Sequence, residues 1–351
     1  MHTSRRPELV RAALLQGNDS RPHPTIARRG LLQAGAASIF APWLSRAAAQ
    51  PGTLESVKIY VGFVAGGLTD IMARRVADKL RGGYAPAVVV ENKPGASGQI
   101  AITQVRDAPA DGSVLLLTHS SALAMYPFTF AKLPYKPMED VLPVSLVCNT
   151  NHALCVGPQV PASITNVKEF LAWTRANPDK ANYGSPGLGS MPHLIMTVVN
   201  KAAGTDLRPI TYRGTAAAIT DMMGGQISAC SGPVGNFLPF LSGGKARLIA
   251  ISGDKRSSFA PDLPTYREQG FALTAREWYG LYLPGKAKPE VQQRASLAAQ
   301  AALADPALIA SLQQSGVDVA SSTPSQLVSM LEADTAEWRR LIKEIGFTAE
   351  S

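Results

Sequence analysis

Residues 57–80 read VKIYVGFVAGGLTDIMARRVADKL, an apolar run followed by a glycine-rich turn and an amphipathic segment. The apolar run predicts a buried strand, and the pattern over 69–82 predicts a helix. Between them, FVAGGLTD at 63–70 places two glycines and a Thr-Asp pair at the start of that helix. Such a turn directs several backbone N–H groups toward one point, and helix N-termini favour anions. The stretch therefore predicts a strand–turn–helix unit that can bind an anionic ligand.

Strand-like and helix-like segments continue to alternate along the chain. Strand-like segments lie at 86–91, 113–118, 152–157, 181–185, 207–212, 227–232 and 247–253, and helix-like segments at 98–107, 166–177, 190–204, 215–225, 288–304, 306–315 and 324–345. Strands that alternate with helices of about ten to fifteen residues are typical of βαβ units and mostly parallel sheets. The chain of 351 residues is long enough for two globular domains. We therefore expect an α/β protein.

The positive charge of the chain is concentrated at its N-terminus. Seven of the 34 basic residues and two of the 26 acidic residues lie in residues 1–50, which leaves 27 basic and 24 acidic residues in the remainder. The formal net charge of +8 thus falls to +3 outside that segment. Because the remainder carries no basic stripe, we expect no nucleic-acid partner.

Residues 1–49 are interpreted as an export signal with a long N-terminal extension. Arg28-Arg29 precede a short apolar stretch, and a run of three alanines that ends at Ala49 follows it. This order is typical of a cleaved signal, and the paired arginines resemble a twin-arginine signal. The alternative is an ordinary buried helix that starts with two arginines. We expect cleavage near Ala49, a periplasmic mature chain from Gln50, and no membrane-spanning helix in the rest.

The three cysteines leave two interpretations open. Cys148 and Cys155 are close enough in sequence to form a disulfide across a turn, which an exported protein permits. Both also lie in apolar, strand-like runs, where a free cysteine behaves as a small hydrophobic residue. Cys230 completes the set. The spacing of cysteines and histidines fits no zinc pattern, so we expect no metal.

Sequence patterns of the common enzyme classes are missing. GASG at 95–98 does not match the Gly-x-Ser-x-Gly nucleophile turn, and SGGKAR at 242–247 lacks the spacing of a phosphate loop. The glycines of FVAGGLTD and of GSPGLGS at 184–190 do not have dinucleotide-binding spacing. His193 is either a base or, as expected for most helical histidines, a contact to ligand or core. We expect no cofactor and no catalytic activity.

Four turns between strands and helices combine small residues, hydroxyl groups and a helix N-terminus. They are FVAGGLTD, THSSAL at 118–123, GSPGLGSMPHL at 184–194 and TYRGTAAA at 211–218. Each of them is, taken alone, an ordinary helix cap or turn. Because open α/β sheets bind ligands at the carboxyl ends of their strands, four such turns in one chain favour a shared cleft.

Six segments together resemble the Bug-type solute-binding proteins, the periplasmic receptors of tripartite tricarboxylate transporters. They are VGFVAGGLTDIMARRVADKL, VVVENKPGASGQIA, APADGSVLLLTHSS, YPFTFAKLPYKPMEDVLPVSLV, TYRGTAAAITDMMGGQI and GKARLIAISGDKRSSFAPDLPTYREQGF, in an order that covers residues 55–346. The resemblance implies a periplasmic binding protein-like fold of two α/β domains, joined by crossover strands around a ligand cleft. The expected boundaries are 50–151 with 275–351 for the first domain and 152–274 for the second.

The resemblance also implies a ligand and the residues that hold it. Ligands of the family are mostly small carboxylates, which the two domains grip through backbone N–H groups, hydroxyl groups and ordered water. The matching positions are Phe63, Ala65, Gly66, Gly67, Thr69, Asp70, Ser120, Ser121, Ser185, Gly187, Gly189, Ser190, His193, Tyr212 and Gly214. The crossover strands near 148–156 and 272–280 would carry the hinge.

Two departures from the family pattern affect the site. Cys230-Ser231-Gly232-Pro233 stand where relatives usually have an Asp-Asn-like pair, so an acidic group is missing from the rim. Arg213 stands where relatives commonly have lysine. A guanidinium there either binds a second carboxylate or is a solvated surface group.

The resemblance leaves open what happens after the ligand has bound. The leading hypothesis is a monomeric receptor that hands a small carboxylate to the membrane subunits of a transporter. The alternatives are a co-sensor that presents the ligand to a membrane sensor kinase, and an exported enzyme.

Overall fold

The computed structural model describes residues 54–348. The expectations for the export signal, its cleavage near Ala49 and a mature start at Gln50 lie outside these residues. No single helix in the described part is long and apolar enough to cross a membrane. The bent pair of α9 (Pro289–Leu303) and α10 (Pro306–Gln313) meets the length and composition requirement only when the two helices are taken together.

One continuous sheet of ten strands runs through the described chain in the order β2-β1-β3-β9-β4-β7-β5-β6, with β8 and β10 both paired to β4. The strands are β1 (Ser56–Val61), β2 (Ala87–Asn92), β3 (Val114–His119), β4 (Val141–Val156), β5 (Asn182–Ser185), β6 (Arg208–Thr211), β7 (Ala229–Pro233), β8 (Arg247–Ile251), β9 (Arg276–Pro284) and β10 (Asp318–Val319). The α/β fold class is as expected, but the sheet is mixed. β1 pairs parallel with β2 and β3, and β5 with β6 and β7, whereas every pairing of β4 and β9 is antiparallel.

The long helices begin and end within three residues of the sequence expectation. They are α1 (Leu68–Leu80), α2 (Gln99–Arg106), α6 (Val167–Ala176), α7 (Met191–Ala203), α8 (Thr215–Met223), α9, α10 and α11 (Pro324–Ile345), and the short helices α3 (Ser120–Ala124), α4 (Tyr126–Thr129) and α5 (Pro137–Asp140) accompany them. Local chemistry explains several ends. Thr323 and Gln326 form a capping box at the start of α11, and Gly346 ends it with a φ of 68°.

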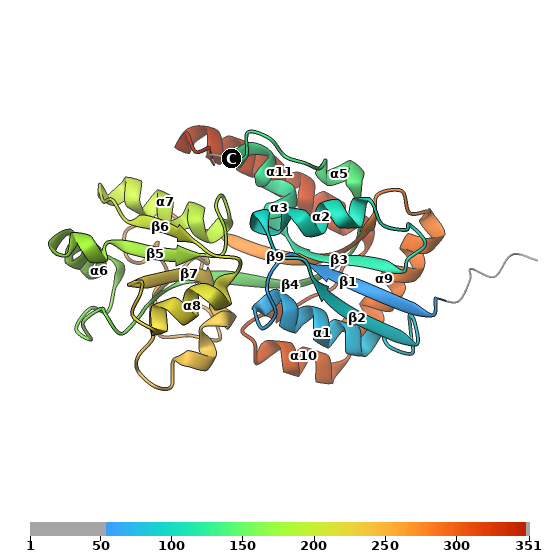
Figure 1. Ribbon diagram of the computed structural model, residues 1–351, viewed down its shortest axis with the longest axis horizontal. Coiled ribbons are helices and arrows are strands. Elements are labelled where there is room, and N and C mark those ends of the chain that lie inside the picture. The colour runs from blue at the N-terminus through green and yellow to red at the C-terminus, as the bar shows by residue number, and fades with distance from the viewer. Residues whose placement is uncertain (1–53, 349–351) are drawn as a thin grey trace, which may run out of the picture. The chain divides into compact units, whose positions relative to one another are not determined.

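β4 belongs to both halves of the sheet. Its 16 residues pair with β9 and β10 up to Asn151, and with β7 and β8 from His152 onward. Figure 1 shows the elements gathered into two groups, with β4 and β9 running between them. We propose to divide the chain here, into a first lobe (54–151 and 275–348) and a second lobe (152–274). The chain returns to the first lobe at Ala275, whose N–H donates to the carbonyl of Ser252 at 2.7 Å.

The apolar core fills the layers between sheet and helices. In the first lobe, Ile59, Leu117 and Leu281 of the sheet belong to one buried cluster with residues of α1, α9 and α10. A second buried cluster extends from α2 and α3 to Phe170 of α6 and Leu194 of α7, and so reaches both lobes. This shared core stabilises the lobes in contact with each other.

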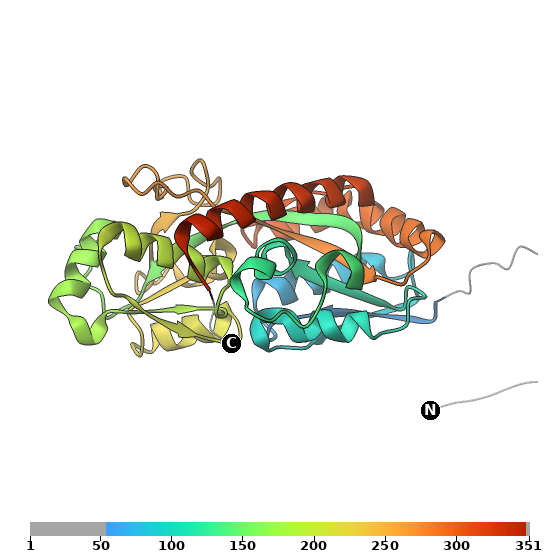
Figure 2. The same ribbon diagram turned by 90° about the horizontal axis from the view of Figure 1, so that it is seen from above.

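Helix α11 extends along both lobes (Figure 2). At its C-terminal end, the carbonyl of Ile345 accepts a hydrogen bond from Lys201 Nζ at 3.0 Å, and the ring of Phe347 meets His193 edge-on at 5.5 Å. Both partners lie on α7. The C-terminal helix therefore links the two lobes in addition to β4 and β9.

All three cysteines are buried and free. Cys148 and Cys155 lie seven positions apart on the single strand β4, where an extended backbone keeps them from meeting. Burial raises the pKa of the Cys155 thiol to about 12. Of the two interpretations, the structure therefore supports the second, in which Cys148 and Cys155 are free and act as small buried hydrophobic residues.

Candidate ligand-binding site

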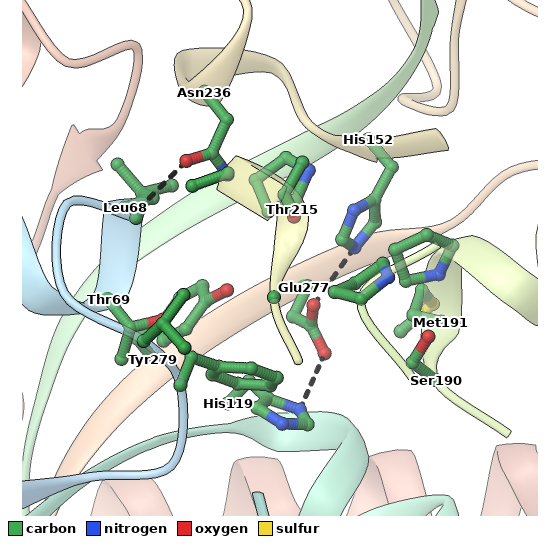
Figure 3. Close-up of a pocket in the computed structure, with 18 residues that line it drawn as sticks. Leu68, Thr69, His119, His152, Ser190, Met191, Thr215, Asn236, Glu277 and Tyr279 are labelled. Atoms are coloured by element: carbon green, nitrogen blue, oxygen red, sulfur yellow. Dashed lines mark hydrogen bonds and ion pairs between the residues drawn. The ribbon is translucent and has the colours of Figure 1, made fainter. Parts of the chain in front are cut away.

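A narrow cavity of about 30 Å³ lies between the two lobes. Its walls come from segments far apart in the sequence (Figure 3). The paired strands β4 and β9, which run between the lobes, bring these segments together. The lining residues are Phe63, Val64, Gly67, Leu68, Thr69, His119, His152, Pro186, Ser190, Met191, Pro192, Gly214, Thr215, Ala216, Pro233, Asn236, Glu277 and Tyr279. No lysine or arginine is among them. A wider hollow of about 600 Å³, lined by residues such as Asp254, Arg256 and Arg276, involves mostly exposed side chains.

Three helix N-termini reach this cavity. Gly67, Ser190 and Gly214 are the N-cap residues of α1, α7 and α8. None of these three residues makes a capping hydrogen bond with its own side chain. Gly214 has a φ of 141°, a conformation that favours glycine. The first N–H groups of a helix have no partner within the helix, and the helix dipole adds partial positive charge there. The cavity wall can therefore bind an anion without a basic side chain.

The buried carboxylate of Asp70 organises the first turn. It accepts hydrogen bonds from the Gly66 N–H at 3.0 Å and from Asn92 Nδ2 at 3.0 Å, and it pairs with Arg74 at 2.9 Å. Burial alone would raise the pKa of Asp70, but these partners, Arg74 above all, hold it below its usual value. Gly66 has a φ of 84°, so this position favours glycine. Asp70 faces the turn rather than the cavity.

His193 organises the turn before α7 in a similar way. Its Nδ1 accepts the N–H of Gly189 at 2.9 Å, and Ser190 Oγ donates to the carbonyl of Gly187 at 2.7 Å. Burial lowers the pKa of His193 to about 4, so the imidazole is neutral near pH 7 and can accept this bond. The side chain supports the turn from behind the cavity wall.

Hydrogen bonds between the lobes hold the cavity closed. Asn236 Oδ1, just after β7, accepts the N–H of Leu68 at the start of α1 at 2.9 Å (Figure 3). The N–H of Val64 donates to the carbonyl of Arg213 at 3.4 Å. Because each bond joins a residue of the first lobe to one of the second, separation of the lobes would break them.

Another hydrogen bond joins the lobes beside a neighbouring hollow that Ser97 and Leu188 line. Ser97 Oγ donates to the carbonyl of Leu188 at 2.9 Å. Ser97 and its neighbour Ala96 are the non-glycine residues of the described chain that have positive φ, at 56° and 47°. A side chain on Gly187 would collide with Ser97. The backbone of the turn at Gly187 therefore packs directly against the side chain of Ser97. Non-glycine residues rarely adopt this conformation, and such strain is common at functional sites.

The floor of the cavity carries a buried acidic group. Glu277 of β9 is 3% exposed and lies between His119, at the end of β3, and His152 of β4 (Figure 3). His119 Nδ1 is 3.2 Å from Glu277 Oε1, and His152 Nε2 is 2.9 Å from Oε2. Ser121 donates to Oε1 through both its N–H and its hydroxyl. Burial would raise the pKa of Glu277, but the two histidines hold it well below its usual value.

The residues expected at the site separate into two layers. Phe63, Gly67, Thr69, Ser190 and Gly214 line the cavity. The others lie outside its wall: Ala65, Gly66, Asp70, Ser120, Ser121, Ser185, Gly187, Gly189, His193 and Tyr212. Tyr212 donates its hydroxyl to Asp221 at 2.8 Å and lines another hollow with the exposed Arg213. Whether each of these positions binds ligand stays a prediction.

Several residues of the wall were not expected from the sequence. Asn236 follows a short strand with no turn pattern, and His119 and His152 belong to no metal-binding spacing of histidines and cysteines. The available signal was a charged residue in an otherwise apolar crossover strand, Glu277 in EWYGLYL. Within residues 54–348, no group of three or more His, Cys, Asp or Glu side chains is arranged to hold a metal ion.

A family model described as "Tripartite tricarboxylate transporter family receptor" matches residues 72–347. The chain belongs to this receptor family. Among curated proteins, a UPF0065 protein of Bordetella bronchiseptica is 32% identical to the receptor over 302 residues, which cover 86% of this chain and 89% of that protein. The family resemblance inferred from the six sequence segments is confirmed.

Solved structures share the fold of the receptor. One described as "Structure of periplasmic binding protein BugD" is 31% identical, with a TM-score of 0.78 over 84% of this chain and 98% of that one. Rpa4515 of R. palustris, solved with adipate, is 26% identical with a TM-score of 0.77 over 83% and 97%. MatC (Rpa3494) of Rhodopseudomonas palustris, with bound malate, is 26% identical with a TM-score of 0.75 over 82% and 98%. The receptor therefore has the periplasmic binding protein fold.

Proposed function

We propose that this protein is an extracytoplasmic receptor that captures a small carboxylate and delivers it to the membrane subunits of a tripartite tricarboxylate transporter. The carboxylate lies between the N-termini of α1, α7 and α8. It accepts hydrogen bonds from backbone N–H groups near Gly67, Thr69 and Thr215 and from the hydroxyl of Ser190. The ligand leaves unchanged, since the role is binding rather than turnover.

The observation that supports this proposal most strongly is the meeting of three helix N-termini, whose N-cap residues supply no side-chain cap, in a cavity without lysine or arginine. Each charge-assisted hydrogen bond contributes about 1.5–3 kcal/mol net. Three or four such bonds, with burial of the ligand, are enough for micromolar affinity at about −8 kcal/mol. The relatives solved with adipate and malate are consistent with carboxylate binding in this fold.

Export is part of the same proposal. A receptor that serves a transporter from outside the cytoplasm needs an export signal, and Arg28-Arg29 with the alanine run ending at Ala49 would supply it. Changing both arginines to lysine should leave the chain uncleaved in the cytosol. An exported, cleaved double variant would contradict a twin-arginine signal.

A thermal-shift screen of the purified protein against small carboxylates tests the binding function. A ligand that binds only the folded state at about 100 times its Kd stabilises that state by about 2.7 kcal/mol, which raises the Tm by several degrees. We expect at least one carboxylate to do so, and mass spectrometry should recover it unchanged. A flat response to the whole panel, with adipate and malate included, would contradict the proposed function.

A further inference from the structure

The Glu277 carboxylate on the cavity floor is the one acidic side chain among the lining residues. It is 3% exposed, and its neighbours His119 and His152 are 3% and 1% exposed. In the described structure, none of the four ring nitrogens of these histidines has an aligned hydrogen-bond partner, although two of them approach the carboxylate closely. Buried polar groups without partners are rare and costly. The cluster is therefore suited to interact with a polar group of a ligand.

The charge of the cluster decides which polar group fits. Glu277 is ionised, as the lowered pKa of its carboxyl indicates. Glu277 is the acidic side chain of the cavity lining, and no lysine or arginine lines the cavity beside it. A carboxylate beside Glu277 would be repelled, whereas an ammonium group would be attracted.

We propose that Glu277, between His119 and His152, accepts the protonated amino group of an amino carboxylate whose carboxylate lies at the N-termini of α1, α7 and α8. This inference rests on the proposed function and specifies its ligand class. It distinguishes this receptor from the two relatives solved with adipate and malate, which are dicarboxylates. The acidic group that is missing at Cys230-Ser231 agrees with it, because Glu277 of β9 would supply an acidic group for the amine instead.

Matched ligand pairs test the proposal by isothermal titration calorimetry. The pairs are aspartate with succinate, 3-aminopropanoate with propanoate, and 4-aminobutanoate with butanoate, so the members of each pair differ only in the amino group. In at least one pair, the amino member should bind at least about tenfold more tightly to the wild-type protein. Glu277→Gln should reduce that preference at least about tenfold and change the affinity for the partner without an amino group less than about threefold.

Controls separate ligand recognition from folding. Glu268→Gln alters an exposed glutamate paired with Arg256 and should leave all affinities unchanged. If Glu277→Gln does not fold, Glu277→Asp is the second variant. It keeps the negative charge on a side chain that is one methylene shorter, and it should partly reduce the preference for the amino member of each pair. Equal or tighter binding by the member without an amino group in every pair, or the same preference in the Glu277 variants, would overturn the inference alone. If no carboxylate binds, including adipate and malate, the proposed function fails as well.

Discussion

At the scale of single residues, we propose that backbone groups contribute to ligand binding as much as side chains do. Gly67 has a φ of −79°, which any residue can adopt, so the backbone conformation does not require glycine at this position. A Cβ at this position would meet only the carbonyl oxygen of Val64, at an ordinary 3.7 Å. We therefore propose that the glycine allows the close approach of a ligand to the start of α1.

Gly67→Val should block that approach while leaving the fold intact. Loss of about two hydrogen bonds, at about 1.5–3 kcal/mol each, would weaken ligand binding on the order of 10²- to 10⁴-fold. Gly83→Val is the matched control, since Gly83 is exposed and a Cβ there meets nothing within 4 Å. Titration calorimetry with the ligand found in the screen measures both. Near-native binding by Gly67→Val would contradict a backbone grip at this turn.

Asp70→Asn should weaken both the fold and the site, because the carboxylate orders the turn. The pKa of Asp70 is lowered in the folded state, so its stabilisation is present above the ordinary carboxyl pKa and is lost as the pH falls through the lowered value. We expect a loss of about 1.5–3 kcal/mol in the free energy of unfolding near pH 7, which shrinks toward zero in acid. Denaturant unfolding at several pH values measures it.

Ligand affinity should also fall more than about tenfold in Asp70→Asn, because the turn is less well ordered. Asp78→Asn, on the same helix, is the control: its ion pair with Arg81 is more than half exposed and should contribute little. Unchanged affinity and stability in Asp70→Asn would show that the Asp70 carboxylate is a dispensable first-turn acid.

At the scale of elements, the start of α1 depends on a residue from the other lobe. Asn236→Ala removes the acceptor of the Leu68 N–H and one of the bonds that hold the lobes together. At about 1 kcal/mol for such a bond, the closed form loses about fivefold in population relative to the open form, and ligand affinity falls by a similar factor. Asn166→Ala removes a comparable cap within the second lobe, on Glu169 N, and should lower stability without this loss of affinity. Equal affinity losses in both variants would contradict a role in closure.

The sequence predicts elements better than it predicts contacts between them. Helix bounds follow from local signals such as Asp305, which caps α10, and the glycines after α7 and α11. The small-residue patterns of FVAGGLTD and GSPGLGSMPHL likewise indicate the turns at Gly67 and Ser190. The contact between Leu68 and Asn236 joins positions 168 residues apart, and Glu277 is carried to His119 and His152 by antiparallel pairing with β3 and β4. Such placements depend on sheet order, which has no local sequence signal.

For the molecule as a whole, we propose that the narrow cavity opens when the two lobes separate, which lets a ligand enter. The residues that connect the lobes lie where β4 changes partners and near Ala275 before β9. Small-angle X-ray scattering should give a smaller radius of gyration at saturating ligand than without ligand. An equal radius in both states, together with slow ligand association, would point to a protein that is already closed when free.

The most direct test of the carboxylate grip is a titration of the ¹⁵N-labelled protein with the best carboxylate from the screen, followed by amide chemical shifts. Hydrogen bonding to a carboxylate moves an amide proton downfield. The account predicts that the largest downfield shifts occur at Gly67, Thr69, Met191 and Thr215, at the three helix N-termini of the cavity. Shifts confined to the hollow around Arg213, or to the wider hollow near Arg256, would contradict it.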